Sequence, residues 1–426
     1  MPTIEQLKED FAVGAYFERF KRVYVNNDAV KPQYERYLAL AQTFASLYGD
    51  GKDVRLFSSP GRTEVGGNHT DHNHGRVLAA SINLDAIAVA AKNDDGIVRV
   101  KSAGYSMDVI DTADLSVHDN EKGHSPALVR GVCKGFQNAG FKIGGFDAAT
   151  ASNVLSGSGL SSSAAYEVLV GTMMNHLYND GKVDAVTIAK IAQYAENEFF
   201  NKPCGLMDQT ACSVGGFVTI DFKDPSEPVI EEVDFDFSSC GHALCIVDTK
   251  GSHSDLTDEY ASIREEMMAI AAKFGKKYLR EVKEVDFMRD IKRLREEVGD
   301  RAVLRAMHFY ADNERVLKEV AALKDADFET FKRNVIESGT SSFTYNQNVF
   351  SAKKLTVQPV SVALAISESV LRGKGAWRVH GGGFAGTIQA FVPNELLSSY
   401  QRALEFVFGE GSCYVLSIRP VGGVEI

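Results

Sequence analysis

Several kinds of segment are missing from this 426-residue sequence. It has no run of about 18 apolar residues, and Met1 to Asp10 is polar and acidic where a secretory signal would be basic and then apolar. Its six cysteines form no C-x-x-C pair, and a chain this long can build its core without disulfides. No basic cluster offsets the net charge of −11, which disfavours binding to nucleic acid or anionic membrane. We therefore expect a cytoplasmic protein whose partners are small molecules, not nucleic acid or a membrane.

The sequence contains three glycine-rich segments that are expected to form loops, at residues 60–75, 156–164 and 380–386. The middle loop, Ser156 to Ala164, runs directly into an apolar helical pattern. Unpaired backbone N–H groups and the positive end of a helix would therefore meet at one point, which we expect to bind phosphate. Such a loop on its own is more often a helix cap than a phosphate site; the two further glycine-rich loops favour the phosphate site here.

Two other classes of enzyme share some of these residues. His69, Asp71, His72 and His74 could converge on zinc in a hydrolase, but the chain has neither H-E-x-x-H nor a cysteine cluster. His380-Gly381-Gly382-Gly383 imitates the oxyanion loop of esterases, yet no G-x-S-x-G follows it. The Walker motif G-x-x-x-x-G-K-[ST] is also absent, so any phosphate site here lacks the lysine of a P-loop.

Patterns of apolar residues and turn residues predict a mixed α and β organisation. A helix is expected from Lys31-Pro32 to Tyr48, ended by Gly49. Strands are expected at 54–57 and 77–91, the latter reversing at 94–96 into a strand at 97–100. Further on we expect a helix at 186–200, strands at 217–222 and 243–248, helices between 257 and 350, and alternating strands with one helix from 377 to 420.

The three loops resemble the signatures of the galactokinase family of GHMP kinases. The family's first signature, G-R-V-N-L-I-G-E-H-T-D-Y-N-x-G, compares with G-R-T-E-V-G-G-N-H-T-D-H-N-H-G from Gly61 to Gly75. The second, G-S-G-L-S-S-S-A, is matched from Gly157 to Ala164, and the third, R-M-T-G-G-G-F-G-G, resembles residues 378–386. Residues 195–197 and 204–209 resemble two further galactokinase segments. The likeness extends over nearly the whole chain.

This resemblance implies an α+β, two-domain GHMP kinase fold. A ribosomal-protein-S5 domain 2-like domain would cover residues 1–224 and a ferredoxin-like domain residues 225–426. The implied reaction transfers the γ-phosphoryl group of ATP to the anomeric hydroxyl of galactose, giving galactose 1-phosphate. Asp208 matches the catalytic base and Arg62 its cationic partner. A carboxylate can accept the hydroxyl proton while a guanidinium stabilises the charge that develops on the phosphoryl group.

The resemblance also implies which residues bind each substrate. Mg²⁺ takes hard oxygen ligands and keeps several waters; Ser163 and Glu196 match its ligands. The ATP phosphates would lie on Gly157, Ser158, Gly159, Leu160, Ser161 and Ser162. The sugar hydroxyls would contact Asn68, His69, Asp71, Gly205 and Tyr260.

Three positions depart from the family pattern. Asn68 stands where galactokinases carry a glutamate that contacts the C6 hydroxyl, His72 replaces a tyrosine, and Ala385 replaces a glycine. Because a neutral amide tolerates a C6 carboxylate that a glutamate would repel, a galacturonate or N-acetylgalactosamine 1-kinase is an alternative. A noncatalytic sugar or nucleotide sensor of the same fold is a third possibility, which the retention of Arg62 and Asp208 disfavours.

Overall fold

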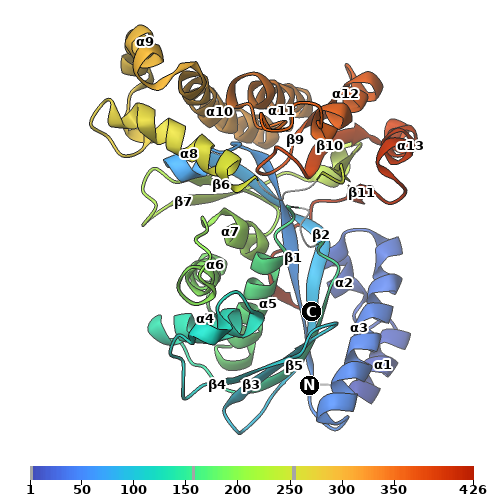
Figure 1. The fold of residues 1–426 in the computed structure, drawn as a ribbon. Helices are drawn as coiled ribbons and strands as arrows, with labels where there is room; N and C mark the ends of the chain where they lie inside the picture. The colour runs from blue at the N-terminus through green and yellow to red at the C-terminus, as the bar shows by residue number, and fades with distance from the viewer. Residues whose placement is uncertain (1–2, 156–158, 252–255) are drawn as a thin grey trace.

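The computed structural model describes residues 3–155, 159–251 and 256–426. In these residues the chain forms an eight-stranded and a four-stranded sheet (Figure 1). The larger sheet contains β12 (Val424–Glu425), β1 (Arg55–Gly66), β2 (Arg76–Lys92), β5 (Phe146–Ser152), β3 (Ile97–Ser102) and β4 (Met107–Asp111) in that order, with β6 (Phe217–Asp221) and β7 (Val229–Val233) continuing from β2. The smaller sheet has the order β11 (Cys413–Leu416), β8 (His242–Asp248), β10 (Thr387–Pro393), β9 (Ala376–Val379). Together with the helices, this mixed architecture confirms the predicted fold class.

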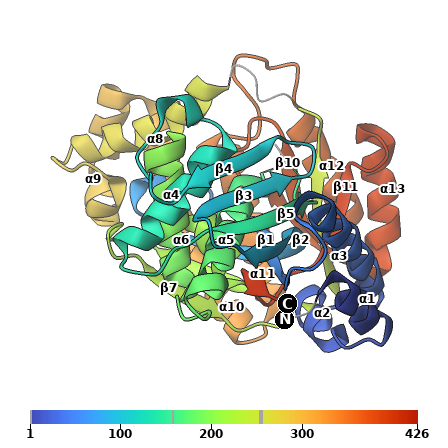
Figure 2. The same ribbon diagram turned by 90° about the horizontal axis from the view of Figure 1, so that it is seen from below.

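Helices cover both faces of the larger sheet (Figures 1 and 2). One face carries α1 (Ile4–Ala12), α2 (Phe17–Tyr24) and α3 (Asn27–Tyr48), and the other carries α4 (Ser125–Asn138), α5 (Ser162–Tyr178), α6 (Ala185–Tyr194) and α7 (Met207–Val214). Successive side chains of a strand point to opposite faces. Accordingly, Ile87 and Val89 of β2 join the core under α1 to α3, whereas Ala88 and Ala90 join the core on the other side.

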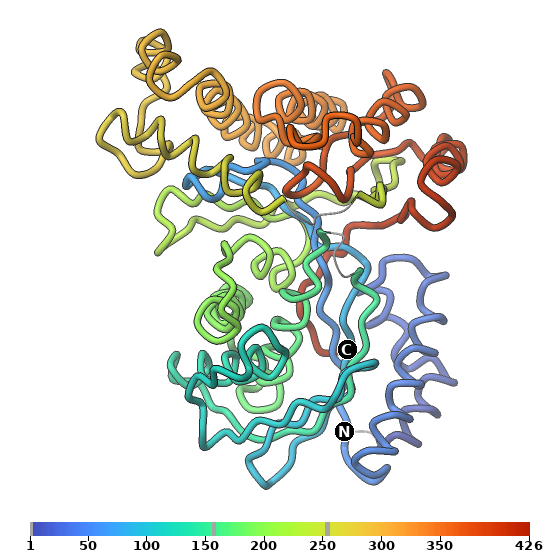
Figure 3. The backbone as a smooth tube through the Cα atoms, in the orientation of Figure 1, coloured from blue at the N-terminus to red at the C-terminus, as the bar shows by residue number. Residues whose placement is uncertain are grey.

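The second half of the chain lies mostly at the upper end of the long β1–β2 hairpin in Figure 1, away from α1 to α3. Its helices are α8 (Thr257–Ala272), α9 (Glu284–Val298), α10 (Asp300–Lys324), α11 (Phe328–Ser341), α12 (Pro359–Leu371) and α13 (Leu397–Phe408). The last segment then returns to the larger sheet, drawn in red in Figure 3, where Glu425 pairs with Phe57. Because β7 and β12 both belong to the larger sheet, the domain division at residue 224/225 stays a prediction. Within the residues described, none of the helices combines the length and apolarity needed to cross a membrane.

Most expected elements form, but three details of the prediction were wrong. The strand expected at 54–57 continues as β1 to Gly66, so the first part of the segment expected as a loop at 60–75 is strand. The helix expected from Lys31-Pro32 is α3 and begins at Asn27, because the Asn26 side chain caps it by accepting the N–H of Asp28 at 2.9 Å, so Pro32 lies inside the helix. The turn at 94–96 does not close a hairpin: β5 lies between β2 and β3, antiparallel to the first and parallel to the second. A reversal of the chain was visible in the sequence, but the long-range partner that separates the two strands was not.

Candidate active site

Arg62 of β1 and Asp208 in the first turn of α7 form a bidentate ion pair. Nε lies 2.8 Å from Oδ1 and Nη2 lies 2.9 Å from Oδ2. The Arg62 side chain is 9% exposed, whereas the carboxylate is 34% exposed and open to a ligand. Burial alone would raise the pKa of Asp208, but the charge and hydrogen bonds of Arg62 outweigh it and hold that pKa below its ordinary value. Asp208 is therefore ionised at neutral pH.

The loop that precedes α5 lies directly on this pair. Arg62 donates its backbone N–H to Leu160 O at 3.1 Å, and its Nη1 donates to Gly159 O. The Ser161 hydroxyl donates to Asp208. Three of the residues predicted to bind ATP, Gly159, Leu160 and Ser161, therefore lie beside the predicted catalytic pair.

Close approach of this loop depends on Gly61. A Cβ at that position would lie 2.8 Å from Leu160 O and 2.9 Å from the side chain of Val154. Ser162 begins α5, so the unpaired N–H groups of a helix N-terminus are available at this point for an anion. The other two predicted phosphate-binding residues, Gly157 and Ser158, lie outside the described residues.

Ser163 and Glu196, the predicted magnesium ligands, lie next to each other. The Ser163 hydroxyl is 3.3 Å from Glu196 Oε1, which also accepts from Lys202 Nζ at 2.7 Å. Gln209 holds the other carboxylate oxygen through Nε2 at 2.8 Å and reaches Glu167 with the same group at 3.2 Å. One hydroxyl and one carboxylate supply the hard oxygens that Mg²⁺ prefers, with room for phosphate and water ligands.

In the part of the chain that the structure describes, no group of three or more His, Cys, Asp or Glu side chains could hold a metal ion. The rival zinc site is not assembled there. Instead, His69 and His72 bond to each other through Nδ1 and Nε2 at 3.1 Å, and His74 stacks on Tyr278.

A cavity of about 930 Å³ opens beside the start of α5. Its size suits a nucleotide-sized ligand. Among the residues that line it are Ser102, Tyr105, Asp108, Ser125, Ser163 and Tyr166. Sequence analysis missed all of these except Ser163. The first four come from the β3–β4 region and the start of α4, and Tyr166 comes from α5. No motif marks them; the only local signal is the helix start at His124-Ser125-Pro126.

The predicted sugar-binding residues come from several separate segments. A Cβ on Gly205 would lie 3.4 Å from Asp71 Oδ2, so these two positions face each other closely. Tyr260 of α8 packs on the third glycine loop, where a Cβ on Gly382 would lie 2.5 Å from its ring. Its hydroxyl donates to Gly383 O at 2.9 Å. Tyr260 therefore holds the third loop, in addition to any contact with sugar.

His69 is held on both ring nitrogens by protein groups. Nε2 lies 2.8 Å from Gly382 O, and Nδ1 faces His72. Because a carbonyl only accepts, Nε2 carries the hydrogen and Nδ1 accepts from His72. Burial, assisted by His72, lowers the pKa of His69 to about 3. The ring is therefore neutral near pH 7.

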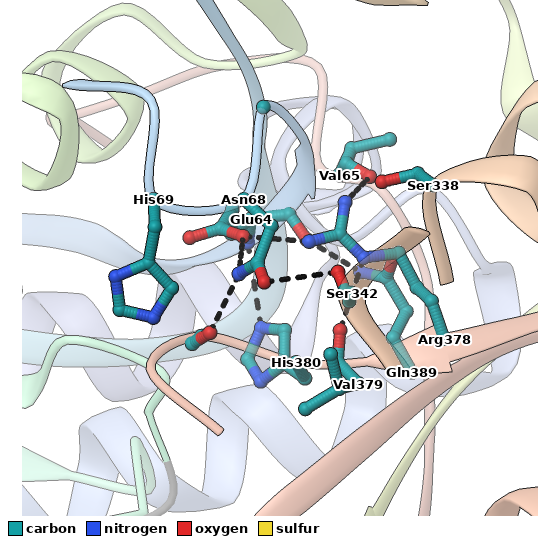
Figure 4. Close-up of polar contacts among 12 residues, drawn as sticks. Glu64, Val65, Asn68, His69, Ser338, Ser342, Arg378, Val379, His380 and Gln389 are labelled. Carbon is teal, nitrogen blue, oxygen red and sulfur yellow. Dashed lines mark hydrogen bonds and ion pairs between the residues drawn. The ribbon is translucent and has the colours of Figure 1, made fainter. Parts of the chain in front are cut away.

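Asn68 is fully buried, and its side-chain amide bonds to Glu64 (Figure 4). The same amide bonds to Gly381 O. The structure thus brings Arg62, Asp208, Ser163 and the residues of the middle loop together. It places Asn68 in the protein interior.

Comparison with known proteins shows what the chain as a whole is similar to. Residues 127–216 match the family described as GHMP kinases N terminal domain, and residues 42–92 match the galactokinase galactose-binding signature. A galactokinase of Streptomyces coelicolor is 31% identical over 374 residues, 87% of this chain and 92% of that protein. The structure of Lactococcus lactis galactokinase complexed with galactose matches with a TM-score of 0.76 at 23% identity, covering 92% of this chain and all of that one. Methanococcus jannaschii mevalonate kinase matches with a TM-score of 0.60 at 13% identity over 86% of this chain and 98% of its own.

The fold is that of a GHMP kinase, and α5 lies within residues 127–216, which match the N-terminal domain of that family. Within that class, the sequence identity and its coverage show that the chain belongs to the galactokinase family.

Proposed function

We propose that this protein is a galactose 1-kinase, which transfers the γ-phosphoryl group of ATP to the anomeric hydroxyl of galactose. The observation that carries the proposal is the bidentate ion pair of Arg62 and Asp208, which contacts the loop before α5. A nucleotide-sized cavity opens beside the start of the same helix. Membership of the galactokinase family supports galactose as the acceptor and ATP as the donor.

Asp208 accepts the proton of the anomeric hydroxyl as its oxygen attacks the phosphoryl group. The carboxylate suits this role because it is ionised and partly exposed. Arg62 orients it through both carboxylate oxygens. The same guanidinium stabilises negative charge on the transferring group, so positioning and electrostatics supply most of the catalysis.

The phosphates of ATP lie against residues 159–162 and the first N–H groups of α5, with the nucleoside in the adjacent cavity. Ser163 and Glu196 hold Mg²⁺, which neutralises phosphate charge when bound. Lys202 and Gln209 keep the Glu196 carboxylate in place.

Asp71, His69, Gly205 and Tyr260 line the sugar side of this site in our proposal. The alternative substrates, galacturonate and N-acetylgalactosamine, were suggested by the neutral side chain of Asn68. Burial of Asn68 among protein groups gives no support for a direct contact with a C6 carboxylate. The choice among the three sugars stays a prediction, with galactose favoured by the family.

The test is ADP release with Mg-ATP across galactose, galacturonate, N-acetylgalactosamine, glucose and arabinose, with Asp208→Asn as the control. Galactose turnover that disappears in the variant supports the proposal. Faster turnover of galacturonate or N-acetylgalactosamine would assign one of the alternative sugars. No turnover with any sugar, together with retained sugar binding, would favour a sensor.

A further inference from the structure

Asn68 uses all of its side-chain hydrogen-bonding capacity on protein groups. Its Nδ2 donates to Glu64 Oε1 at 2.9 Å and to Gly381 O at 2.8 Å. Its Oδ1 accepts from Ser342 Oγ at 3.1 Å and from Asn348 Nδ2 at 2.8 Å. A side-chain amide has two N–H donors and an oxygen with two lone pairs. No group is left for a sugar hydroxyl.

The orientation of this amide is determined by its neighbours. Turning it over would place the oxygen against Gly381 O, which only accepts, and the nitrogen against Asn348 Nδ2, which only donates. The main chain is held as well. The N–H of Asn68 donates to Asp312 Oδ2 at 2.8 Å, and its carbonyl accepts from His308 Nε2 at 2.8 Å.

These bonds join three segments that are far apart in the sequence. Asn68 belongs to the first glycine loop, Gly381 to the third, and Ser342 to the short π-helix Ser342–Asn346 that follows α11. In the first loop, the predicted sugar-binding residue His69 directly follows Asn68. On the third loop, the predicted sugar-binding residue Tyr260 packs against Gly382. The position of Asn68 therefore sets how the two loops face each other.

Glu64 is the charged partner of Asn68. Its Oε1 accepts from Asn68 and also from Arg378 Nη2 at 2.7 Å, and both Glu64 and Arg378 are buried (Figure 4). Arg378 also donates to Val65 O at 2.6 Å. In the family signature G-R-V-N-L-I-G-E-H the amide stands at the position of Glu64 and the acid at that of Asn68. This chain carries the same two groups exchanged and bonded to each other.

We propose that Asn68 is a positioning residue and not a sugar contact: with Glu64 it forms an acid–amide pair that holds the first and third glycine loops in register, and the two residues act as a unit. The inference rests on the proposed kinase activity for its kinetic readout. It follows that position 68 does not select among sugars by bonding to a hydroxyl.

The first experiment uses Asn68→Ala with galactose and with its 2-, 3-, 4- and 6-deoxy derivatives. Losing buried bonds in both loops raises the KM for galactose about 10-fold, leaves the KM for ATP unchanged, and weakens every deoxy sugar by the same factor. If one deoxy sugar has the same KM in variant and wild type, Asn68 contacts the missing hydroxyl and the proposal is overturned. A change in kcat alone would indicate a purely structural role and would also overturn it.

Asn334→Ala is the matched control for that experiment. Asn334 is a buried asparagine of α11 whose Nδ2 donates to Thr330 O at 2.8 Å. Its removal tests the cost of losing a buried amide away from the glycine loops. We expect an unchanged KM for all five sugars.

The second experiment compares Asn68→Glu, Glu64→Asn and the double exchange. Asn68→Glu brings two buried carboxylates together, and Glu64 already takes the hydrogen bond of Arg378, so kcat/KM for galactose falls at least about 10-fold. The double exchange recovers part of this loss, because Asn at 64 can donate to the acid and still accept from Arg378, although an acid at 68 cannot donate to Gly381 O. A double variant no better than Asn68→Glu, or higher galactose activity in Asn68→Glu alone, would overturn the proposal.

A wild-type protein that phosphorylates no sugar would refute the proposed function and not this pairing. The pairing is then measured by urea unfolding of the same four proteins. Effects on stability that simply add would show two independent residues, which would overturn the acid–amide unit.

Discussion

Arg62 and Asp208 lie 146 residues apart in the sequence and meet through two hydrogen bonds of 2.8 and 2.9 Å, one to each carboxylate oxygen. The arginine comes from the rigid β1 strand and the aspartate from the first turn of α7. The arrangement keeps an acid charged while leaving part of it exposed. Such a pair is more specific than a surface ion pair, because the planar guanidinium matches both carboxylate oxygens.

Replacing Asp208 with Asn should lower kcat by about 10²- to 10⁴-fold. Because Arg62 holds the pKa of Asp208 below its ordinary value, protonation of this group reduces activity only below about pH 4. The wild-type rate should therefore not fall through this group between about pH 8 and pH 6. A pH–rate profile for kcat/KM provides the measurement. An acid limb that is centred near pH 6 and absent from Asp208→Asn would contradict the assignment.

Gly61→Ala should displace the loop before α5. The new Cβ would lie 2.8 Å from Leu160 O, a backbone atom that cannot turn aside. We expect a loss of about 1–3 kcal/mol in the free energy of unfolding and a raised KM for ATP. Gly51→Ala is the control, since a Cβ there meets nothing within 4 Å. Equal effects of the two substitutions would show that the loop does not depend on Gly61.

Glu196→Gln tests the proposed metal site. The substitution keeps the size of the side chain but removes its charge and leaves one oxygen, not two, to accept from Lys202 and Gln209. The magnesium concentration needed for half-maximal rate should rise about 10- to 100-fold, measured by titrating Mg²⁺ at fixed ATP. Glu198→Gln is the control, because Glu198 lies exposed on the same turn. An unchanged magnesium requirement in Glu196→Gln would exclude this residue as a ligand.

His380→Gln should reduce the loss of stability on acidification. Burial and the charges of Arg62 and Arg378 lower the pKa of His380 to about 3. The unfolded chain binds a proton below about pH 6.5 and the folded chain does not, so this group lowers stability as the pH falls from that value. The contribution is about 2 kcal/mol at pH 5. Urea unfolding at pH 7 and pH 5 should show a change that is smaller by this amount in the variant, and an equal change would refute the prediction.

Glu319→Gln should stabilise the protein at high pH relative to low pH. Within the described part of the chain, neither carboxyl oxygen of Glu319 has a hydrogen-bond partner, and a Cβ on Gly66 would lie 1.8 Å from Oε2. Burial, followed by the charge of Asp312, raises the pKa of Glu319 well above its ordinary value. The folded chain therefore retains a proton that the unfolded chain releases above about pH 4.5, and stability falls as the pH rises. Unfolding at pH 5 and pH 8 should show a gain of at least about 1 kcal/mol in the variant at the higher pH; no difference would contradict it.

Local patterns were enough to predict much of the fold. The helix ending at Gly49 and the helix that begins beside Ser161 follow from apolar spacing and from glycine or serine at the ends. Strand pairing was harder. The hairpin expected at 94–96 is absent because β5, about 50 residues further on, pairs with both β2 and β3.

The candidate site was likewise only partly predictable from the sequence. The glycine-rich loops and the match of Arg62, Ser163, Glu196 and Asp208 to the family were visible in order along the chain. The cavity lined by Tyr105 and Asp108 was not, because no short motif marks these residues. Asn68 was noticed as a departure, yet nothing in the sequence indicated that its amide is used up by Glu64, Gly381, Ser342 and Asn348.

The sequence by itself determined the family, the three loops and the types of residue available for phosphoryl transfer, because these depend on short spacings and on residue chemistry. Only the tertiary structure decided which of these residues meet. Contacts such as that of Arg62 with Asp208, or of Asn68 with Gly381, join segments 146 and 313 residues apart. Their geometry depends on how two sheets and their helices pack, and packing is a property of the whole chain.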